Sequence, residues 1–244
     1  MTKDRNEKRP TDEKGSLRIS GLIRRRLREA VFGVQDGLIS TLGALTGIAE
    51  GTESRTAVVI SGVVIIVVES LSMAAGSYLS SKSHKQYLQR LLREEEEQIA
   101  RDPEGERREI WAMYRERGYP DEEIEIIANR LLSDKTLLLE DMAHKELGIA
   151  PASQEGPASN ALVMGIAYVL GGLVPVLPYL ILSIDAAMPL SVSGTLIALF
   201  LFGGLKGRLV GQNGWRSALE MVGIAGLAAA AGYGIGRLAS FWIK

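Results

Sequence analysis

Long apolar stretches alternate with polar ones along this chain, and five of the apolar stretches are long enough to cross a membrane. The hydrocarbon core of a bilayer needs about 20 predominantly apolar residues for each helix. The stretches that qualify cover residues 30–49, 56–80, 158–183, 189–205 and 217–242. The pattern predicts an all-α polytopic membrane protein with five transmembrane helices.

A polar segment, residues 81–150, separates the second and third spans and has a helical pattern throughout. Its first part continues the second span into water, Asp102 and Pro103 start a second helix, and Pro120 starts a third after Gly118. The third helix carries apolar residues at helical spacing: Ile124, Ile127, Leu131, Leu138 and Met142. We expect a three-helix insert that packs as a small bundle or against a second copy.

Charge is segregated in the same way, although the net charge of the chain is only −1. Residues 81–150 hold 12 Lys and Arg against 17 Asp and Glu, whereas residues 1–29 hold 10 against 5. Chains of this kind place Lys and Arg on the cytoplasmic side. The short loops at 50–55 and 183–189 hold a single arginine between them, so we expect the N-terminus and residues 81–150 in the cytoplasm and the C-terminus outside.

These observations predict four parts. They are a disordered cytoplasmic tail, the first two spans, the cytoplasmic helical domain and the last three spans, over residues 1–24, 25–80, 81–150 and 151–244. No signal-peptide pattern opens the chain, and the loops are short, which favours a bacterial inner membrane. Nothing in the charge pattern calls for a nucleic-acid partner.

The first span contains an acid, Asp36, and the second contains Glu69 and Met73. An acid at the centre of a membrane helix costs about 2.5–3.5 kcal/mol, so each one invites a functional reason. Asp36 lies roughly 12 Å inside its span at 1.5 Å per residue, and Met73 lies at a similar depth in the antiparallel second span. We expect Asp36 to face Met73, with Glu69 one turn further out, along a path for a cation. Structural, protonated or hydrogen-bonded acids are the alternative.

Small residues extend these two faces. Gly43 and Gly47 follow Asp36 and Ser40 at helical spacing, and Gly76 follows Met73. Small residues allow membrane helices to approach closely. We therefore expect the first two spans to meet along these faces.

The insert is rich in acids that share helix faces. The spacing brings together Glu94 with Glu97, Glu106 with Glu109, and Met142 with Glu146. Carboxylates without cysteine favour Fe²⁺, Mn²⁺ or Ca²⁺ over Zn²⁺ or Cu⁺. A solvated charged helix with Arg and Lys partners is the alternative reading of any such run.

Catalysis is not expected. The chain has no cysteine, which removes thiolate metal sites and thiol nucleophiles. Helical di-iron enzymes use paired Glu-x-x-His motifs, and neither His84 nor His144 follows a glutamate three residues earlier. No permanently bound cofactor is expected.

The motifs together resemble the vacuolar iron transporter family over residues 25–242. They are "REAVFGVQDGLIS", "ESLSMAAGSYLSSKS", the acidic insert ending "EDMAHKELGI", and "GGLVPVLPY". The resemblance implies a homodimer in the lipid bilayer that exports Fe²⁺, and often Mn²⁺, from the cytoplasm in exchange for protons. It also implies that Asp36 and Met73 line the pathway at the dimer interface.

The resemblance further implies metal ligands in the insert near Glu95, Glu106, Glu109, Met142 and Glu146. The ungapped register pairs Glu95 with Gln98, while a shift by one pairs Glu94 with Glu97, so both registers stay open. Plant-type members carry an acid two turns before the methionine, where this chain has Ile65; Glu69 lies only one turn before it. A membrane-anchored metal sensor or buffer is the alternative function.

Overall fold

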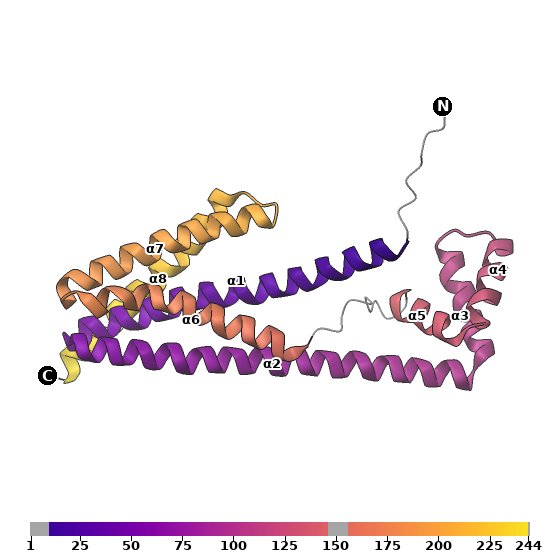
Figure 1. The fold of residues 1–244 in the computed structure, drawn as a ribbon, viewed down its shortest axis with the longest axis horizontal. Coiled ribbons are helices and arrows are strands. Elements are labelled where there is room, and N and C mark those ends of the chain that lie inside the picture. The colour runs from indigo at the N-terminus through magenta and orange to yellow at the C-terminus, as the bar shows by residue number, and fades with distance from the viewer. Residues whose placement is uncertain (1–9, 146–155, 244) are drawn as a thin grey trace, which may run out of the picture. The chain divides into compact units, whose positions relative to one another are not determined.

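The computed structural model describes the backbone of residues 10–145 and 156–243, and side chains over 26–145 and 156–242. Figure 1 shows a chain built of helices alone in this described part. In order they are α1 (Pro10–Thr52), α2 (Arg55–Arg101), α3 (Pro103–Glu116), α4 (Asp121–Leu132), α5 (Lys135–Lys145), α6 (Pro157–Ile181), α7 (Ile184–Leu209) and α8 (Gly214–Ile243).

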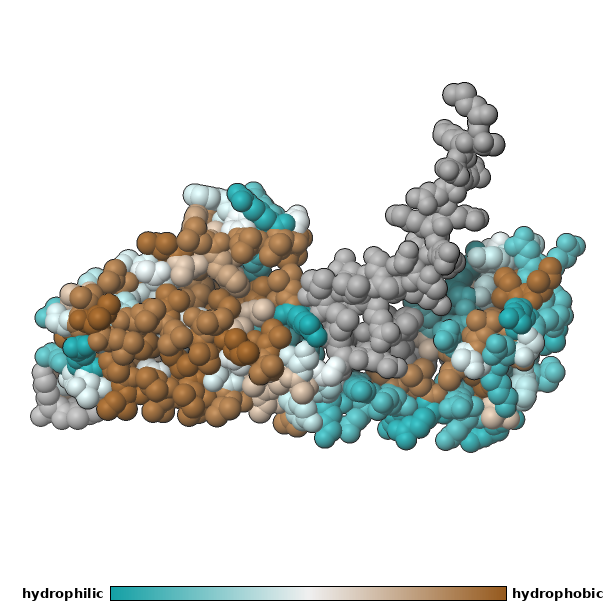
Figure 2. Space-filling model, viewed as in Figure 1, coloured by the Kyte–Doolittle hydropathy of each residue, from teal (hydrophilic) through white to brown (hydrophobic). Residues whose placement is uncertain are grey.

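In the described part of the chain, five helices are long and apolar enough to cross a membrane, which confirms the five expected spans. They are α1 from Arg26, α2, α6, α7 and α8. Figure 2 shows the hydrophobic surface gathered over these helices and the hydrophilic surface over the insert. Helix α7 begins at Ile184, so most of the segment expected as a loop at 183–189 is helical, with Pro189 inside the helix.

The chain divides into two compact units. The membrane unit comprises residues 23–79 and 156–244, and the helical insert comprises residues 80–155 together with 1–22. Helix α1 begins at Pro10, within residues 1–24 for which we expected a disordered tail. Residues 1–9 lie outside the described part.

In the membrane unit, the part of α1 from Arg26 to Thr52 packs against α6 through its first half and against α8 through its second half. A β-carbon on Gly33 would lie 2.7 Å from the carbonyl oxygen of Met164 on α6, and one on Gly47 would lie 2.7 Å from that of Gly232 on α8. Gly43 likewise lies against Ala228, and Gly51 against Gly236. Gly43 and Gly47 were expected to bring the first two spans together, but they contact the fifth span instead. The spacing of the glycines predicts which face of the helix carries small residues, but it does not predict which helix packs against that face.

The end of α6 is held from two sides. Ser191 on α7 donates a hydrogen bond to the carbonyl oxygen of Pro175 at 2.7 Å. The Nε of Arg55, at the start of α2, donates to the carbonyl oxygen of Tyr179 at 2.7 Å, and its Nη2 donates to the carbonyl oxygen of Leu180. Side chains of neighbouring helices thus satisfy carbonyl groups at the proline-containing end of α6.

The helical insert follows the expected boundaries up to Pro120. Helix α2 continues to Arg101, and Asp102 caps α3 by accepting a hydrogen bond from the Gly105 amide at 2.8 Å. Gly118 takes a positive φ of 84°, which ends this element. The single third helix that we expected is instead two, α4 and α5, because Asp134 accepts from the amides of Thr136 and Leu137 and starts a new helix.

Candidate functional site

Contacts between α1 and α2 fix the register of the first two spans. Ser77 on α2 donates a hydrogen bond to Glu29 on α1 at 3.0 Å, and further along the pair Gly62 packs against Leu45. The helices run antiparallel, so each step forward on α1 is a step back on α2. Asp36 lies seven residues after Glu29 and is therefore level with Ser70, which lies seven residues before Ser77.

This register places Glu69 beside Asp36, and the charges of the two carboxylates interact. Met73 lies three residues from Ser70 towards Ser77, about 4.5 Å at 1.5 Å per residue. The expected arrangement, with Asp36 level with Met73, is therefore displaced by nearly one turn. The order along the pair is Glu29 with Ser77, then Met73, then Asp36 with Glu69.

The exposure of these side chains differs. Asp36 and Met73 are half-buried, whereas Glu69 is exposed on a single chain. Ser72 and Gly76 are exposed on the same face, and no atom lies within 4 Å of a β-carbon built on Gly76. Helix α2 thus carries an uncovered face that includes a carboxylate.

A buried tyrosine from α6 reaches the same level. The hydroxyl of Ser40 donates to the backbone carbonyl of Asp36 at 2.7 Å, and it lies 2.7 Å from the hydroxyl of Tyr168. The two hydroxyl groups therefore share a hydrogen bond between α1 and α6. The charges of both Asp36 and Glu69 act on this phenol, so three helices contribute to one polar level.

Our sequence analysis missed three residues of this region: Glu29, Ser77 and Tyr168. Glu29 was left outside the first span because it follows the basic run "RRRLR". The pattern that reveals it is its spacing of seven residues from Asp36, which puts both on one face of a helix. Ser77 likewise lies four residues after Met73.

In the insert, the structure separates the expected ligands by burial. Glu95, Glu106 and Met142 are buried, Glu94, Glu97 and Glu109 are exposed, and Glu146 lies outside the described residues. Glu94 forms an ion pair with Arg90 at 2.7 Å. Of the two registers, only the one with Glu95 directs a carboxylate into the interior.

Glu95 and Glu106 lie on the inner faces of their helices. Glu95 precedes Ile99 by one turn, and Glu106 precedes Ile110 by one turn; both isoleucines belong to the core of the insert. A buried carboxylate needs a cation or hydrogen-bond donors to offset its desolvation. These two acids therefore have surroundings unlike those of the solvated glutamates.

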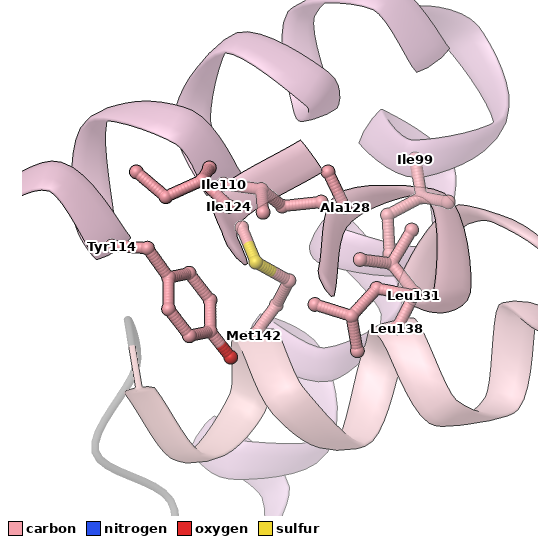
Figure 3. Close-up of a cluster of buried hydrophobic side chains, with 8 residues drawn as sticks. All are labelled: Ile99, Ile110, Tyr114, Ile124, Ala128, Leu131, Leu138 and Met142. Atoms are coloured by element: carbon pink, nitrogen blue, oxygen red, sulfur yellow. The ribbon is translucent and has the colours of Figure 1, made fainter. Parts of the chain in front are cut away.

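Met142 belongs to this core as well. It is fully buried, and Figure 3 shows its thioether inside the cluster, near Tyr114 and the isoleucines of α3 and α4. Across the residues that the structure describes, no group of three or more His, Asp or Glu side chains is gathered as for a metal ion. Glu146, one of the expected ligands, lies outside the described residues, so a metal site in the insert stays a prediction.

Two clusters of hydrogen-bonded polar side chains border the core of the insert. Burial acts to lower the pKa of Lys145, but its hydrogen bonds to Asp141 and Tyr114 outweigh burial and raise that pKa. Arg107 donates a hydrogen bond to Glu125 and holds the pKa of that carboxyl below its usual value, with Asn129 donating a second one at 3.0 Å. These groups tie α3 to α4 and to α5.

Comparison with known proteins gives consistent matches over most of the chain. The model of the VIT family matches residues 27–237. Vacuolar iron transporter 1 of Oryza sativa subsp. japonica is 32% identical over 212 residues, covering 86% of this chain and 84% of the rice protein. Vacuolar iron transporter 1 of Arabidopsis thaliana is 32% identical over 214 residues, covering 87% and 85%. The vacuolar iron transporter of Toxoplasma gondii is 27% identical over 222 residues, covering 87% and 74%.

Proposed function

Because this chain belongs to the VIT family, we propose that it transports Fe²⁺, and also Mn²⁺, out of the cytoplasm in exchange for protons. The family relatives are transporters and not enzymes, and iron is here the cargo and no resident cofactor. The observation that carries the proposal is the carboxylate pair Asp36 and Glu69, which lie at one level on two neighbouring membrane-spanning helices.

The chemistry follows from competition at the carboxylates. A metal ion binds the ionised form, so its arrival displaces protons and its departure lets them return. In the proposed cycle, acids of the insert collect the metal ion, Met73 and Asp36 pass it along the pathway, and Asp36 and Glu69 take up protons as it leaves. Carboxylate and thioether ligands suit a borderline cation such as Fe²⁺.

The decisive experiment uses purified protein in liposomes. Uptake of Fe²⁺ and Mn²⁺ should require a pH gradient, and Asp36→Ala should abolish it while the variant remains folded. Glu50→Ala, at the other end of α1, is the matched control and should transport at the wild-type rate. Wild-type transport by Asp36→Ala would overturn the proposed pathway.

A homodimer is part of the proposal, supported by the uncovered face of α2. Glu69 is exposed on a single chain, and a carboxylate facing lipid is unfavourable. A twofold axis along this face would cover Glu69 and bring both copies of Asp36 to one pathway. The chain has no cysteine, so Gly76→Cys should form a disulfide-linked dimer on mild oxidation, whereas Leu227→Cys on exposed α8 should not.

The proposed orientation has the N-terminus and the insert in the cytoplasm and the C-terminus outside, in a bacterial inner membrane. The Lys and Arg bias of the loops supports it. A membrane-impermeant thiol reagent applied to intact cells should label Ser183→Cys and leave Ser83→Cys unlabelled. The opposite labelling would show the opposite orientation, and the proposed direction of transport would then be wrong.

The second candidate function is a membrane-anchored metal sensor or buffer. It is favoured by the insert's own core and by its buried acids, Glu95 and Glu106. It predicts that the intact protein binds Fe²⁺ but moves none across the liposome membrane. Flux measurements on the wild type therefore separate the two functions.

A further inference from the structure

The hairpin formed by α7 and α8 carries three cations around its turn. Lys206 and Arg208 lie in the last turn of α7, and Arg216 lies in the first turn of α8. Between Asp185 and Glu220 the chain has no acidic residue. Within the described part of the chain, none of the three cations forms an ion pair. The hairpin therefore presents positive charge that these ion pairs leave free for a ligand.

Close packing of the two helices brings Arg208 to the start of α8. A β-carbon on Gly207 would lie 2.7 Å from the Cα of Gly214, so the two backbones touch at this point. The Cγ of Arg208 lies 3.5 Å from a β-carbon built on Gly214. Trp215 and Arg216 follow Gly214 directly in the chain. Two arginines from different helices therefore adjoin one close helix contact.

An exposed aromatic side chain lies beside this contact. Trp215 is 64% exposed, and its ring packs edge to face against Phe200 of α7, with 5.1 Å between the ring centroids. Tryptophan is favoured at the membrane surface, where its ring meets hydrocarbon and its N–H meets water and lipid headgroups. The hairpin thus combines positive charge with a side chain typical of the headgroup level.

Apolar surface continues from the arginines along both helices. Ile197, Leu201 and Arg208 are spaced by four and seven residues, which places them on one side of α7. Ile197 and Leu201 are exposed, as is Leu219, one turn after Trp215 on α8. Figure 2 shows hydrophilic residues at the turn of this hairpin, next to hydrophobic surface. A charged end in line with an apolar surface matches a lipid better than a small soluble anion.

We propose that the α7–α8 hairpin binds an anionic phospholipid of the leaflet that it borders. Arg208 and Arg216 bind the phosphate, because a guanidinium donates two parallel hydrogen bonds to phosphate oxygens. One acyl chain follows Ile197 and Leu201. This site lies on helices other than those that carry Asp36 and Glu69, and it does not depend on the proposed transport function.

Cations at a loop also orient a membrane protein, without holding any particular lipid. Lys206 separates the two roles. It lies two residues before Arg208 and so points to a different side of α7, although it contributes the same charge to the loop. Lys206→Gln is therefore the matched control for Arg208→Gln.

The experiment uses the full chain in phosphatidylcholine liposomes, with Trp215 as the sole tryptophan after Trp111→Phe and Trp242→Phe. A small part of the lipid carries brominated acyl chains, which quench tryptophan fluorescence on contact, and it is either phosphatidylglycerol or phosphatidylcholine. The ratio of the two quenching efficiencies measures selectivity. We expect a selectivity for phosphatidylglycerol of about tenfold, and a loss of about fivefold in Arg208→Gln or Arg216→Gln.

Lys206→Gln should keep the wild-type selectivity. Because the ratio compares two lipids on one variant, a loss of folded protein does not imitate the expected result. Equal quenching by the two lipids in the wild type overturns the proposal, as does an equal loss in Lys206→Gln and Arg208→Gln. Loss of selectivity on addition of millimolar inorganic phosphate also overturns it, because the hairpin would then recognise a free anion and not a lipid.

Discussion

The membrane unit and the helical insert are both built of helices, but their helices meet in different ways. In the membrane unit, α1 approaches α6 and α8 through glycines, so that backbone lies against backbone. In the insert, the helices meet through a core of aliphatic side chains with Tyr114 and Met142. Lipid supplies no hydrophobic drive for helices to associate, so membrane helices depend on close contact, whereas water drives the insert's apolar faces together.

The same difference changes what an acidic residue means. In the membrane unit an acid is costly, so Asp36 and Glu69 are informative from the sequence alone. In the insert, most acids are solvated or paired with arginine, as Glu94 is with Arg90. There, only burial distinguishes Glu95 and Glu106 from their neighbours.

The largest expected effect comes from filling a glycine contact of the membrane unit. Gly47→Leu places side-chain atoms where Gly232 of α8 already lies, and overpacking of this kind costs about 3 kcal/mol or more. When the variant is heated in detergent, we expect it to lose its monodisperse species at a clearly lower temperature than the wild type does. In a background with Trp215 and Trp242 replaced by Phe, the fluorescence of Trp111 reports on the insert alone. It should show that Gly47→Leu leaves the stability of the insert unchanged.

Gly223→Leu is the control for this change. No atom lies within 4 Å of a β-carbon on Gly223, so this variant should keep the wild-type stability. Equal losses for both variants would show that helix propensity or expression, and not the α1–α8 contact, determines the outcome.

An intermediate effect is expected at Met142 in the insert. Met142→Ala should reduce the free energy of unfolding of the insert by about 2–5 kcal/mol, because it leaves a cavity in a closed core. Met142→Leu keeps the volume and should cost less than about 1.5 kcal/mol. Trp111 fluorescence during denaturant unfolding measures both.

The leucine variant also tests the ligand role that the resemblance implies for Met142. With packing retained and sulfur removed, Fe²⁺ binding to the full protein should weaken while stability stays close to wild type. Unchanged Fe²⁺ binding, measured by calorimetry under anaerobic conditions, would leave Met142 as a core residue alone.

The smallest effect is a pH dependence at Glu125. Because the hydrogen bond from Arg107 lowers the pKa of this carboxyl in the folded state, its contribution to stability is complete above its ordinary pKa of 4.5. The contribution is lost as the pH falls through the lowered pKa. Glu125→Gln should therefore reduce insert stability slightly at pH 7 and converge with the wild type in strong acid. Parallel pH profiles for the two proteins would contradict this assignment.

Much of the fold follows from the sequence, because its determinants are local. Apolar length gives the spans, and a cap followed by proline gives the start of α3 at Asp102. Asp134 was missed as a second cap because the apolar spacing from Leu131 to Leu138 continues across it. A seven-residue spacing is compatible with one helix or with two that share a core.

The pairing of faces could not be predicted in the same way. The spacing of Gly43 and Gly47 shows a small face, and any of the four other spans offers a partner with glycines or alanines. Which residue of α2 lies opposite Asp36 depends on the register of the two helices, and the contact between Glu29 and Ser77 shows that register. A depth counted from the ends of apolar segments carries an error of several residues, and that error exceeds the difference between Met73 and Ser70.

Arg55 has a consequence for biosynthesis. The carbonyl oxygen that accepts its Nε hydrogen bond belongs to a residue 124 positions later in the chain. When the first two spans enter the membrane, that acceptor has not yet been made, and the guanidinium must stay hydrated at the interface. The arginine finds its place only once the third span inserts, so the helical hairpin formed first is completed by a segment translated after the whole insert.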